Sequence, residues 1–153
     1  FDTVKHVLDT YEEDLNKTFE YVVLLEPTSP LREKSDIDNM IKNLTDEEYY
    51  FDSIISVGEV HEHPSIMKKI VDGNRLEQFC SELNMTSRRQ DNKPAYFPYG
   101  VAYIAKTPIL LEQKTFYTER STFYQIKRYQ CYEIDDIYDF LSIESVMKHE
   151  WGA

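Results

Sequence analysis

Residues 21–32 read YVVLLEPTSPLR, and they predict both the fold and a ligand-binding loop. Residues 21–25 are a continuous apolar run of strand-forming types, which is typical of a strand buried on both faces by helices. The loop that follows offers the hydroxyls of Thr28 and Ser29 and the guanidinium of Arg32. Because ligands of open α/β sheets bind beyond the carboxyl ends of strands, this loop is a candidate phosphate or carboxylate site. A rigid turn whose arginine pairs with a surface acid is the alternative.

Helical and strand patterns alternate around this strand. They predict a helix before it, capped by Asp2, and a helix after the loop, capped by Ser35 or Asp36. Residues 53–57 indicate another buried strand, which implies a right-handed crossover in a parallel α/β sheet. Further along the chain we expect a strand at 66–71 with a hairpin turn at 72–74, a strand at 95–105, a helix at 108–113, a strand at 124–134 and a helix at 137–147.

The composition predicts one soluble globular domain over residues 1–153. Its formal net charge of -11 argues against nucleic-acid or anionic-membrane partners, which reward clustered Lys and Arg. Any phosphate ligand must therefore meet local cations or a metal ion. Cys80 and Cys131 fit neither a zinc nor a disulfide pattern, and no apolar stretch is long enough to span a bilayer. These features favour a reducing cytoplasm.

Glu133 and Asp135 lie at the end of the last expected strand. Strand alternation puts both carboxylates on one face, and carboxylate oxygens with water and phosphates are the ligands that Mg²⁺ prefers. The pair is thus a candidate metal site that would neutralise charge on a transferring phosphoryl group. The alternative is that Asp135 or Asp136 simply caps the last helix, with Asp139 as an acid of its first turn.

A small basic patch, Arg88-Arg89-Gln90, stands out in this acidic chain. It suits a triphosphate or a sugar carboxylate, and a solvated loop with local ion pairs is the alternative. Lys68 is a further cation that we expect to reach the ligand-binding cleft. His61 and His63 alternate as strand ligands would, but no third metal ligand accompanies them, so we interpret them as ordinary loop residues.

Tyr99 and Tyr103 are the tyrosines that we most expect to line a pocket, because they flank Gly100. The residues predicted to bind substrate are therefore, in chain order, Glu26, Thr28, Ser29, Arg32, Lys68, Arg88, Arg89, Gln90, Tyr99, Gly100 and Tyr103. Glu133 and Asp135 are the predicted catalytic and metal-binding residues.

Five motifs in register resemble the acylneuraminate cytidylyltransferase family along nearly the whole chain. Residues 24–32 resemble its LLQPTSPLR signature, 52–57 its DS-hydrophobic-SV strand, 89–91 its RQ loop, 100–104 the Gly and Tyr-Ile of NGAIYI, and 134–140 its ID…DF ending. The resemblance implies a Rossmann-like nucleotide-diphospho-sugar transferase fold, truncated at the N-terminus, with a mixed sheet flanked by helices. It also implies a homodimeric nucleotidyltransferase that transfers CMP from CTP to a nonulosonic acid with Mg²⁺ and releases pyrophosphate.

Specific residues follow from the same resemblance. Asp135 matches a metal-binding aspartate of the family, and Glu133 stands where its partner aspartate is expected. Residues 62–93 correspond to a dimerisation insert through which one subunit completes its neighbour's sugar pocket. Glu26 replaces a glutamine that contacts the sugar, Tyr99 replaces the asparagine before the family's glycine, and Phe97 aligns with an arginine that engages the sugar carboxylate. These departures point to a sugar other than N-acetylneuraminate, and 3-deoxy-manno-octulosonate is left open.

The Gly- and basic-rich CTP loop of the family, of the type ARxGSKxxxxKN, has no counterpart in these 153 residues. Together with the start at Phe1, this predicts the C-terminal portion of a CMP-sugar synthetase that is inactive alone. A different class of function is also open: a non-catalytic dimerisation or regulatory module of the same fold.

Overall fold

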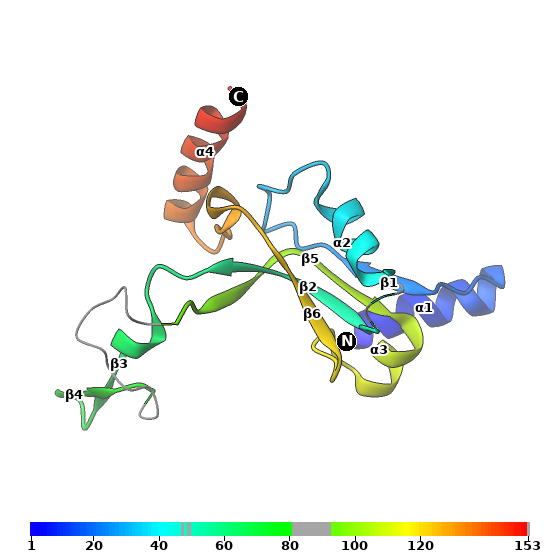
Figure 1. The fold of residues 1–153 in the computed structure, drawn as a ribbon, viewed down its shortest axis with the longest axis horizontal. Coiled ribbons are helices and arrows are strands. Elements are labelled where there is room, and N and C mark those ends of the chain that lie inside the picture. Colours follow the sequence, from blue (N-terminus) through cyan, green and yellow to red (C-terminus); the bar gives the residue numbers. More distant parts are fainter. Residues whose placement is uncertain (47, 49, 81–92, 153) are drawn as a thin grey trace.

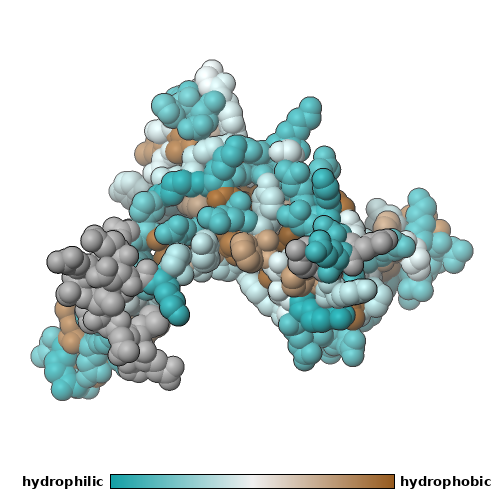
Figure 2. Space-filling model, in the orientation of Figure 1, coloured by the Kyte–Doolittle hydropathy of each residue, from teal (hydrophilic) through white to brown (hydrophobic). Residues whose placement is uncertain are grey.

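The computed structural model describes residues 1–46, 48, 50–80 and 93–152 (Figure 1). The helices are α1 (Asp2–Leu15), α2 (Asp36–Leu44), α3 (Thr107–Gln113) and α4 (Ile137–Trp151). The strands are β1 (Tyr21–Leu24), β2 (Ser53–Glu59), β3 (Lys68–Val71), β4 (Arg75–Gln78), β5 (Tyr96–Lys106) and β6 (Ser121–Gln125). On the face drawn in Figure 2, hydrophilic residues cover most of the surface, in keeping with the net charge of -11.

The main sheet has the strand order β1-β5-β2-β6. β1 and β2 each pair antiparallel with β5, whereas β2 pairs parallel with β6. A mixed sheet flanked by helices, as the family resemblance implied, is confirmed, whereas the parallel pairing expected from the strand and helix patterns occurs only between β2 and β6. The reason is that β5 enters from the excursion after β2 and inserts, with opposite direction, between the two strands that α2 connects.

α2 covers the centre of this sheet. Its Met40 and Leu44 are fully buried and pack against Ile54 of β2 and against Ala102 and Ile104 of β5. The alternating residues of two strands and an apolar stripe at helical spacing therefore form one core.

Asp36 is the first residue of α2 but is not its N-cap. Ser35 takes the cap position without a side-chain hydrogen bond, while the buried Asp36 carboxylate accepts from the backbone N–H of Glu33 at 2.7 Å. It also accepts from the amide of Gln130 at 2.6 Å and the hydroxyl of Tyr124 at 3.2 Å. Asp36 thus connects α2 to the segment after β6.

β1 contradicts the expectation of a strand buried on both faces. It is an edge strand in which Val23 is 38% exposed. The neighbouring α1 has no buried residue, so it shields little of the sheet. The predicted cap Asp2 is also wrong, because Phe1 takes the cap position and Asp2 lies in the first turn, where its charge complements the helix dipole.

The hairpin predicted after residue 66 is confirmed. β3 and β4 form a separate two-stranded sheet that extends from the body of the molecule (Figure 1). Asp72 and Gly73 have φ values of 52° and 76°, as the central positions of a type I′ turn require. Ile70 and Leu76 face each other across the strands and are 72% and 71% exposed. An isolated hairpin with such exposed apolar residues has little packing of its own.

The strand expected at 124–134 is wrong for most of its length. β6 ends at Gln125, and a short 3-10 helix, Arg128–Gln130, follows. The side chain of Gln130 causes this turn, because it accepts from the backbone N–H of Lys127 at 3.0 Å and donates to the carbonyl of Leu31 at 3.1 Å. The strand at 95–105 and the helices at 108–113 and 137–147 are confirmed by β5, α3 and α4.

α4 decides which aspartate is the cap. Asp136 caps the helix by accepting from the backbone N–H groups of Tyr138 and Asp139. In return, the Asp139 carboxylate accepts from the backbone N–H of Asp136. Asp135 lies outside this capping box, with its side chain exposed. None of the helices in the described part of the chain combines the length and apolarity that crossing a membrane would require.

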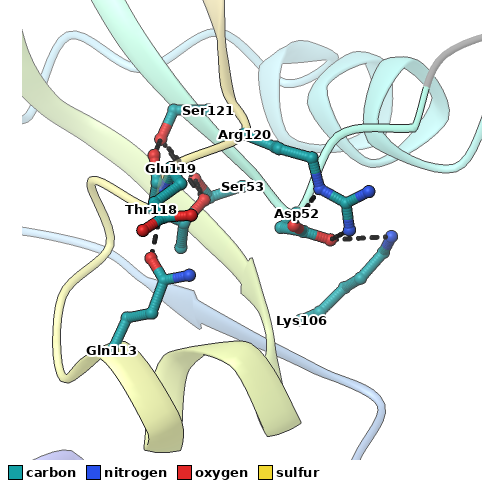
Figure 3. Close-up of polar contacts among 8 residues, drawn as sticks. All are labelled: Asp52, Ser53, Lys106, Gln113, Thr118, Glu119, Arg120 and Ser121. Carbon is teal, nitrogen blue, oxygen red and sulfur yellow. Dashed lines mark hydrogen bonds and ion pairs between the residues drawn. The ribbon is translucent and has the colours of Figure 1, made fainter.

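A polar cluster closes the amino end of β2 (Figure 3). The buried carboxylate of Asp52 accepts from Nε of Arg120 at 2.7 Å and from the ammonium of Lys106 at 3.2 Å. Next to it, the hydroxyls of Ser53 and Thr118 lie 2.8 Å apart. These contacts join the beginnings of β2 and β6 to the end of β5.

Candidate functional site

Three segments that lie far apart in the sequence meet at the carboxyl end of β1. The backbone N–H of Glu26 donates to the carbonyl of Gly100 at 3.1 Å, and the N–H of Ile134 donates to the carbonyl of Thr28 at 2.9 Å. The loop after β1 is therefore held between β5 and the segment that leads to α4. The sequence-predicted loop, the Gly100 motif and the residue between the two predicted metal ligands thus come together.

Glu133 is the side chain that connects the three segments. Its Oε1 accepts from the backbone N–H of Gly100 at 2.8 Å and from the hydroxyl of Ser29 at 3.1 Å. Ser29 is only 1% exposed, so its hydroxyl needs this acceptor. One oxygen of Glu133 is thus committed to the protein, and Oε2 makes no hydrogen bond that involves the described residues.

Arg32 stiffens the loop through backbone carbonyls. Its Nε donates to the carbonyl of Val101 at 2.6 Å, and a terminal nitrogen lies 3.3 Å from the carbonyl of Glu26. No carboxylate of the described residues lies within ion-pair distance, so the alternative of a surface ion pair is wrong. Arg32 therefore joins the loop that carries Thr28 and Ser29 to β5.

Glu26 lies directly over Gly100. A Cβ atom at residue 100 would be 2.2 Å from Oε2 of Glu26, so only glycine leaves room for this carboxylate. Burial, and then the nearby carboxylate of Glu133, raise the pKa of Glu26. The carboxyl groups of Glu26 and Glu133 therefore lie near each other at Gly100. Hydrogen-bond donors or a cation would stabilise this acidic pair.

A cavity of about 350 Å³ opens beside Glu26. Its lining includes Tyr103 of β5 and, from the loop after α3, Lys114 and Tyr117. Burial, followed by the neighbouring Tyr117, raises the pKa of Tyr103, so its hydroxyl is a donor at neutral pH. Tyr103 was predicted to line a pocket, and this is confirmed. Lys114 and Tyr117 were not predicted, because no motif marks residues 107–121.

Glu133 and Asp135 fit a magnesium ion only in part. The free oxygen of Glu133 and the exposed carboxylate of Asp135 are the right donor type, and Mg²⁺ commonly takes one or two carboxylates with water and phosphates. No cluster of three or more metal-ligating side chains occurs within the described ranges. The protein groups would therefore hold the ion together with phosphate oxygens of a substrate.

The other predicted site residues do not join this group. Lys68 lies on β3 in the separate sheet, where its ammonium donates to Gln78. The ring of Tyr99 contacts Phe97, with the ring centroids 5.2 Å apart. Arg88, Arg89 and Gln90 lie outside the described residues.

Gly100→Ala is expected to lower the free energy of unfolding by about 1–3 kcal/mol, because the new methyl group overlaps the Glu26 side chain. Urea unfolding followed by circular dichroism measures this. Gly152→Ala is the matched control, since nothing lies within 4 Å of its added methyl group and only the positive φ of 67° opposes it, which costs about 1–2 kcal/mol. Wild-type stability in Gly100→Ala would contradict the observed contact.

Comparisons with known proteins agree with the motifs. The chain is 32% identical over 148 residues to an N-acylneuraminate cytidylyltransferase of Streptococcus agalactiae serotype V, and the alignment covers 94% of the chain and 33% of that relative. The protein of the same name from serotype III is 31% identical with the same coverage. Its namesake from Escherichia coli is 28% identical over 140 residues, covering 92% of the chain and 32% of the relative. No family model matches. The resemblance is confirmed, and the chain spans about a third of the length of these relatives.

Proposed function

We propose that this chain, as a homologue of one segment of the N-acylneuraminate cytidylyltransferases, carries the sugar side of a cytidylyltransferase site. The observation that supports this is the meeting of three separately predicted motifs at Glu133, which accepts from Ser29 and from Gly100. In the complete protein the reaction is transfer of CMP from CTP to a nonulosonic acid.

The proposed reaction forms one bond and breaks another at the α-phosphorus of CTP. A hydroxyl oxygen of the sugar acid attacks this phosphorus and releases its proton to solvent, and the bond to the pyrophosphate leaving group breaks. Positioning and charge stabilisation are the main tasks of the protein in such a reaction. Thr28 and Tyr103 offer donors to the sugar, and the acceptor Glu26 takes a hydrogen bond from a sugar hydroxyl or amide. Arg32 holds their loop in place.

Magnesium is the cofactor that we propose. Asp135 and the second oxygen of Glu133 would hold it together with phosphate oxygens, and the ion would supply positive charge for the transferring group. Ser29 acts indirectly, since its hydrogen bond orients the Glu133 carboxylate.

A homodimer is the assembly that we propose, with residues 62–93 as its contact region. Apolar side chains of the hairpin region that are more than 40% exposed would be buried there: Ile66, Met67, Ile70, Leu76 and Phe79. An isolated hairpin gains stability from such a partner surface. The free thiols of Cys80 and Cys131 suit the reducing cytoplasm.

The test is a pyrophosphate-release assay on the full-length protein that contains this chain. Substrates would be CTP with N-acetylneuraminate, with other nonulosonic acids and with 3-deoxy-manno-octulosonate. We expect release that needs both a nonulosonic acid and Mg²⁺. Release with 3-deoxy-manno-octulosonate alone would change the substrate. No release with any sugar acid would favour the non-catalytic module.

Ser29→Ala in the full-length protein is expected to reduce kcat/KM about 10-fold, because Glu133 loses one of two donors that orient it. The same assay measures this. Ser53→Ala is the matched control, since it also removes a buried hydroxyl but at the opposite end of the sheet. Equal losses in both variants would indicate a general folding effect and contradict the role of Ser29.

A further inference from the structure

A second hollow of about 340 Å³ lies at the carboxyl ends of β2 and β6, where these parallel strands finish side by side. Its polar lining residues are Glu59, His61, Gln125 and Arg128. The carboxyl edge of parallel strands is where α/β proteins bind ligands. None of these four residues belongs to the Glu133 site.

Arg128 is the cation of this hollow. Its Nε donates to Nε2 of His61, and its guanidinium carbon lies 5.2 Å from the centroid of the Tyr132 ring. Together with the Cys131 thiol, which also hydrogen-bonds with Arg128, these two groups hold the guanidinium. By contrast with Arg75 and Arg120, Arg128 has no carboxylate of the described residues within ion-pair distance.

The contact with His61 determines which donors face the hollow. An imidazole that accepts at Nε2 keeps Nδ1 as its donor. It therefore orients Arg128 without neutralising the positive charge. The Arg128 side chain also hydrogen-bonds with the Cys131 thiol, and its remaining N–H groups are available for a planar, two-point contact with an anion.

The inner wall of the hollow is closely packed and adds no negative charge. A Cβ atom at Gly58 would lie 2.3 Å from the sulfur of Cys131, which shows how tightly β2 meets this wall. Burial raises the pKa of the Cys131 thiol, so it is neutral at physiological pH. Glu59 is exposed, and solvent screens its carboxylate.

We propose that Arg128, oriented by His61, forms an anion-binding subsite for a carboxylate or phosphate group. The ligand would bridge the remaining N–H groups of Arg128, while its hydroxyl groups would contact Glu59 and Gln125. The chain as a whole repels anions through its charge of -11, so only a local donor set of this kind would hold one. This subsite does not depend on turnover of CTP.

The test is an NMR titration of the 153-residue chain at constant ionic strength, following the Nε–H signal of Arg128. Inorganic phosphate and N-acetylneuraminate are the two probes. We expect a saturable shift with at least one of them. Saturation with phosphate alone identifies a phosphate site, and saturation with N-acetylneuraminate alone identifies a carboxylate site. A linear, non-saturating response to both probes would overturn the proposal.

Substitutions of Arg128 and His61 test whether these side chains bind the anion. With the remaining amide signals as readout, Arg128→Gln is expected to weaken binding at least about 10-fold, since hydrogen bonds to charged groups are the strong ones. Arg75→Gln on the hairpin is the control and should bind as wild type does. His61→Ala should weaken binding, whereas His61→Gln, whose amide oxygen also accepts from Arg128, should restore it. Wild-type binding by a folded Arg128→Gln would refute the subsite.

Discussion

Asp52→Asn is expected to lower the free energy of unfolding by about 2 kcal/mol at pH 7. The carboxylate is 3% exposed and accepts from Arg120 at 2.7 and 2.9 Å and from Lys106 at 3.2 Å. Asparagine keeps the volume but loses the charge and one acceptor. Removing one partner of a buried ion pair costs about 3–5 kcal/mol. The loss is smaller here because the Arg120 side chain is 60% exposed, so water solvates it.

The pH dependence gives this prediction a second readout. Burial by itself raises the pKa of Asp52, but the hydrogen bonds and charges of Arg120 and Lys106 outweigh it, so the net effect is a lowered pKa. A carboxyl group whose pKa is lower in the folded state stabilises the fold above its unfolded pKa, about 3.9. This contribution is lost as the pH falls through the folded value. The difference between wild type and Asp52→Asn should therefore shrink below about pH 4.

Urea unfolding at pH 7, 5 and 3 measures both effects. Glu77→Gln is the matched control, because the ion pairs of Glu77 on the hairpin are exposed and worth less than about 1 kcal/mol. A stability of Asp52→Asn within about 0.5 kcal/mol of wild type at pH 7 would contradict the role of this cluster.

Asp135→Asn in the full-length protein is expected to reduce pyrophosphate release by at least about 100-fold, because metal-assisted charge neutralisation would be lost. The fold should be unaffected, since the Asp135 side chain is exposed and the cap of α4 is Asp136. Steady-state kinetics at several Mg²⁺ concentrations measure the loss.

Asp136→Ala separates catalysis from capping. It removes the acceptor for two backbone N–H groups of α4 and should cost about 1 kcal/mol of stability. Its turnover should stay within about 3-fold of wild type, since Asp136 has no proposed role in the reaction. Near-normal turnover in Asp135→Asn, or an equal loss in both variants, would sink the metal assignment.

Sequence patterns predicted helices, strands and turns correctly where residues close together in the sequence determine them. The helix after the loop, the turn at 72–74 and an aspartate cap before the last helix depend on neighbours within a few residues. The strand expected at 124–134 was wrong because Gln130 turns the chain through one local and one distant contact: it accepts from the N–H of Lys127 and donates to the carbonyl of Leu31. A window of sequence around Gln130 contains no sign of the Leu31 partner.

In the candidate site, too, local patterns identified individual residues and distant contacts decided how they are arranged. The motifs marked Ser29, Gly100 and Glu133 separately, and strand alternation then grouped Glu133 with Asp135 as a candidate pair of metal ligands. The structure instead ties Glu133 to Ser29 and Gly100, while Asp135 is exposed beside the cap. Arg128 and Lys114 were not marked at all, because their significance lies in neighbours from other strands and loops.

By itself the sequence determined the family resemblance, most of the helices and strands, and the residue types available for chemistry. These depend on which residues follow one another within short stretches of the chain. Only the tertiary structure decided that β5 enters between β1 and β2, which oxygen of Glu133 accepts hydrogen bonds from the protein, and that Arg128 lies in a hollow where no carboxylate of the described residues pairs with it. The physical reason is that strand pairing, burial and hydrogen bonding join residues about a hundred positions apart, as Ser29 and Glu133 are, and no local pattern records such a contact.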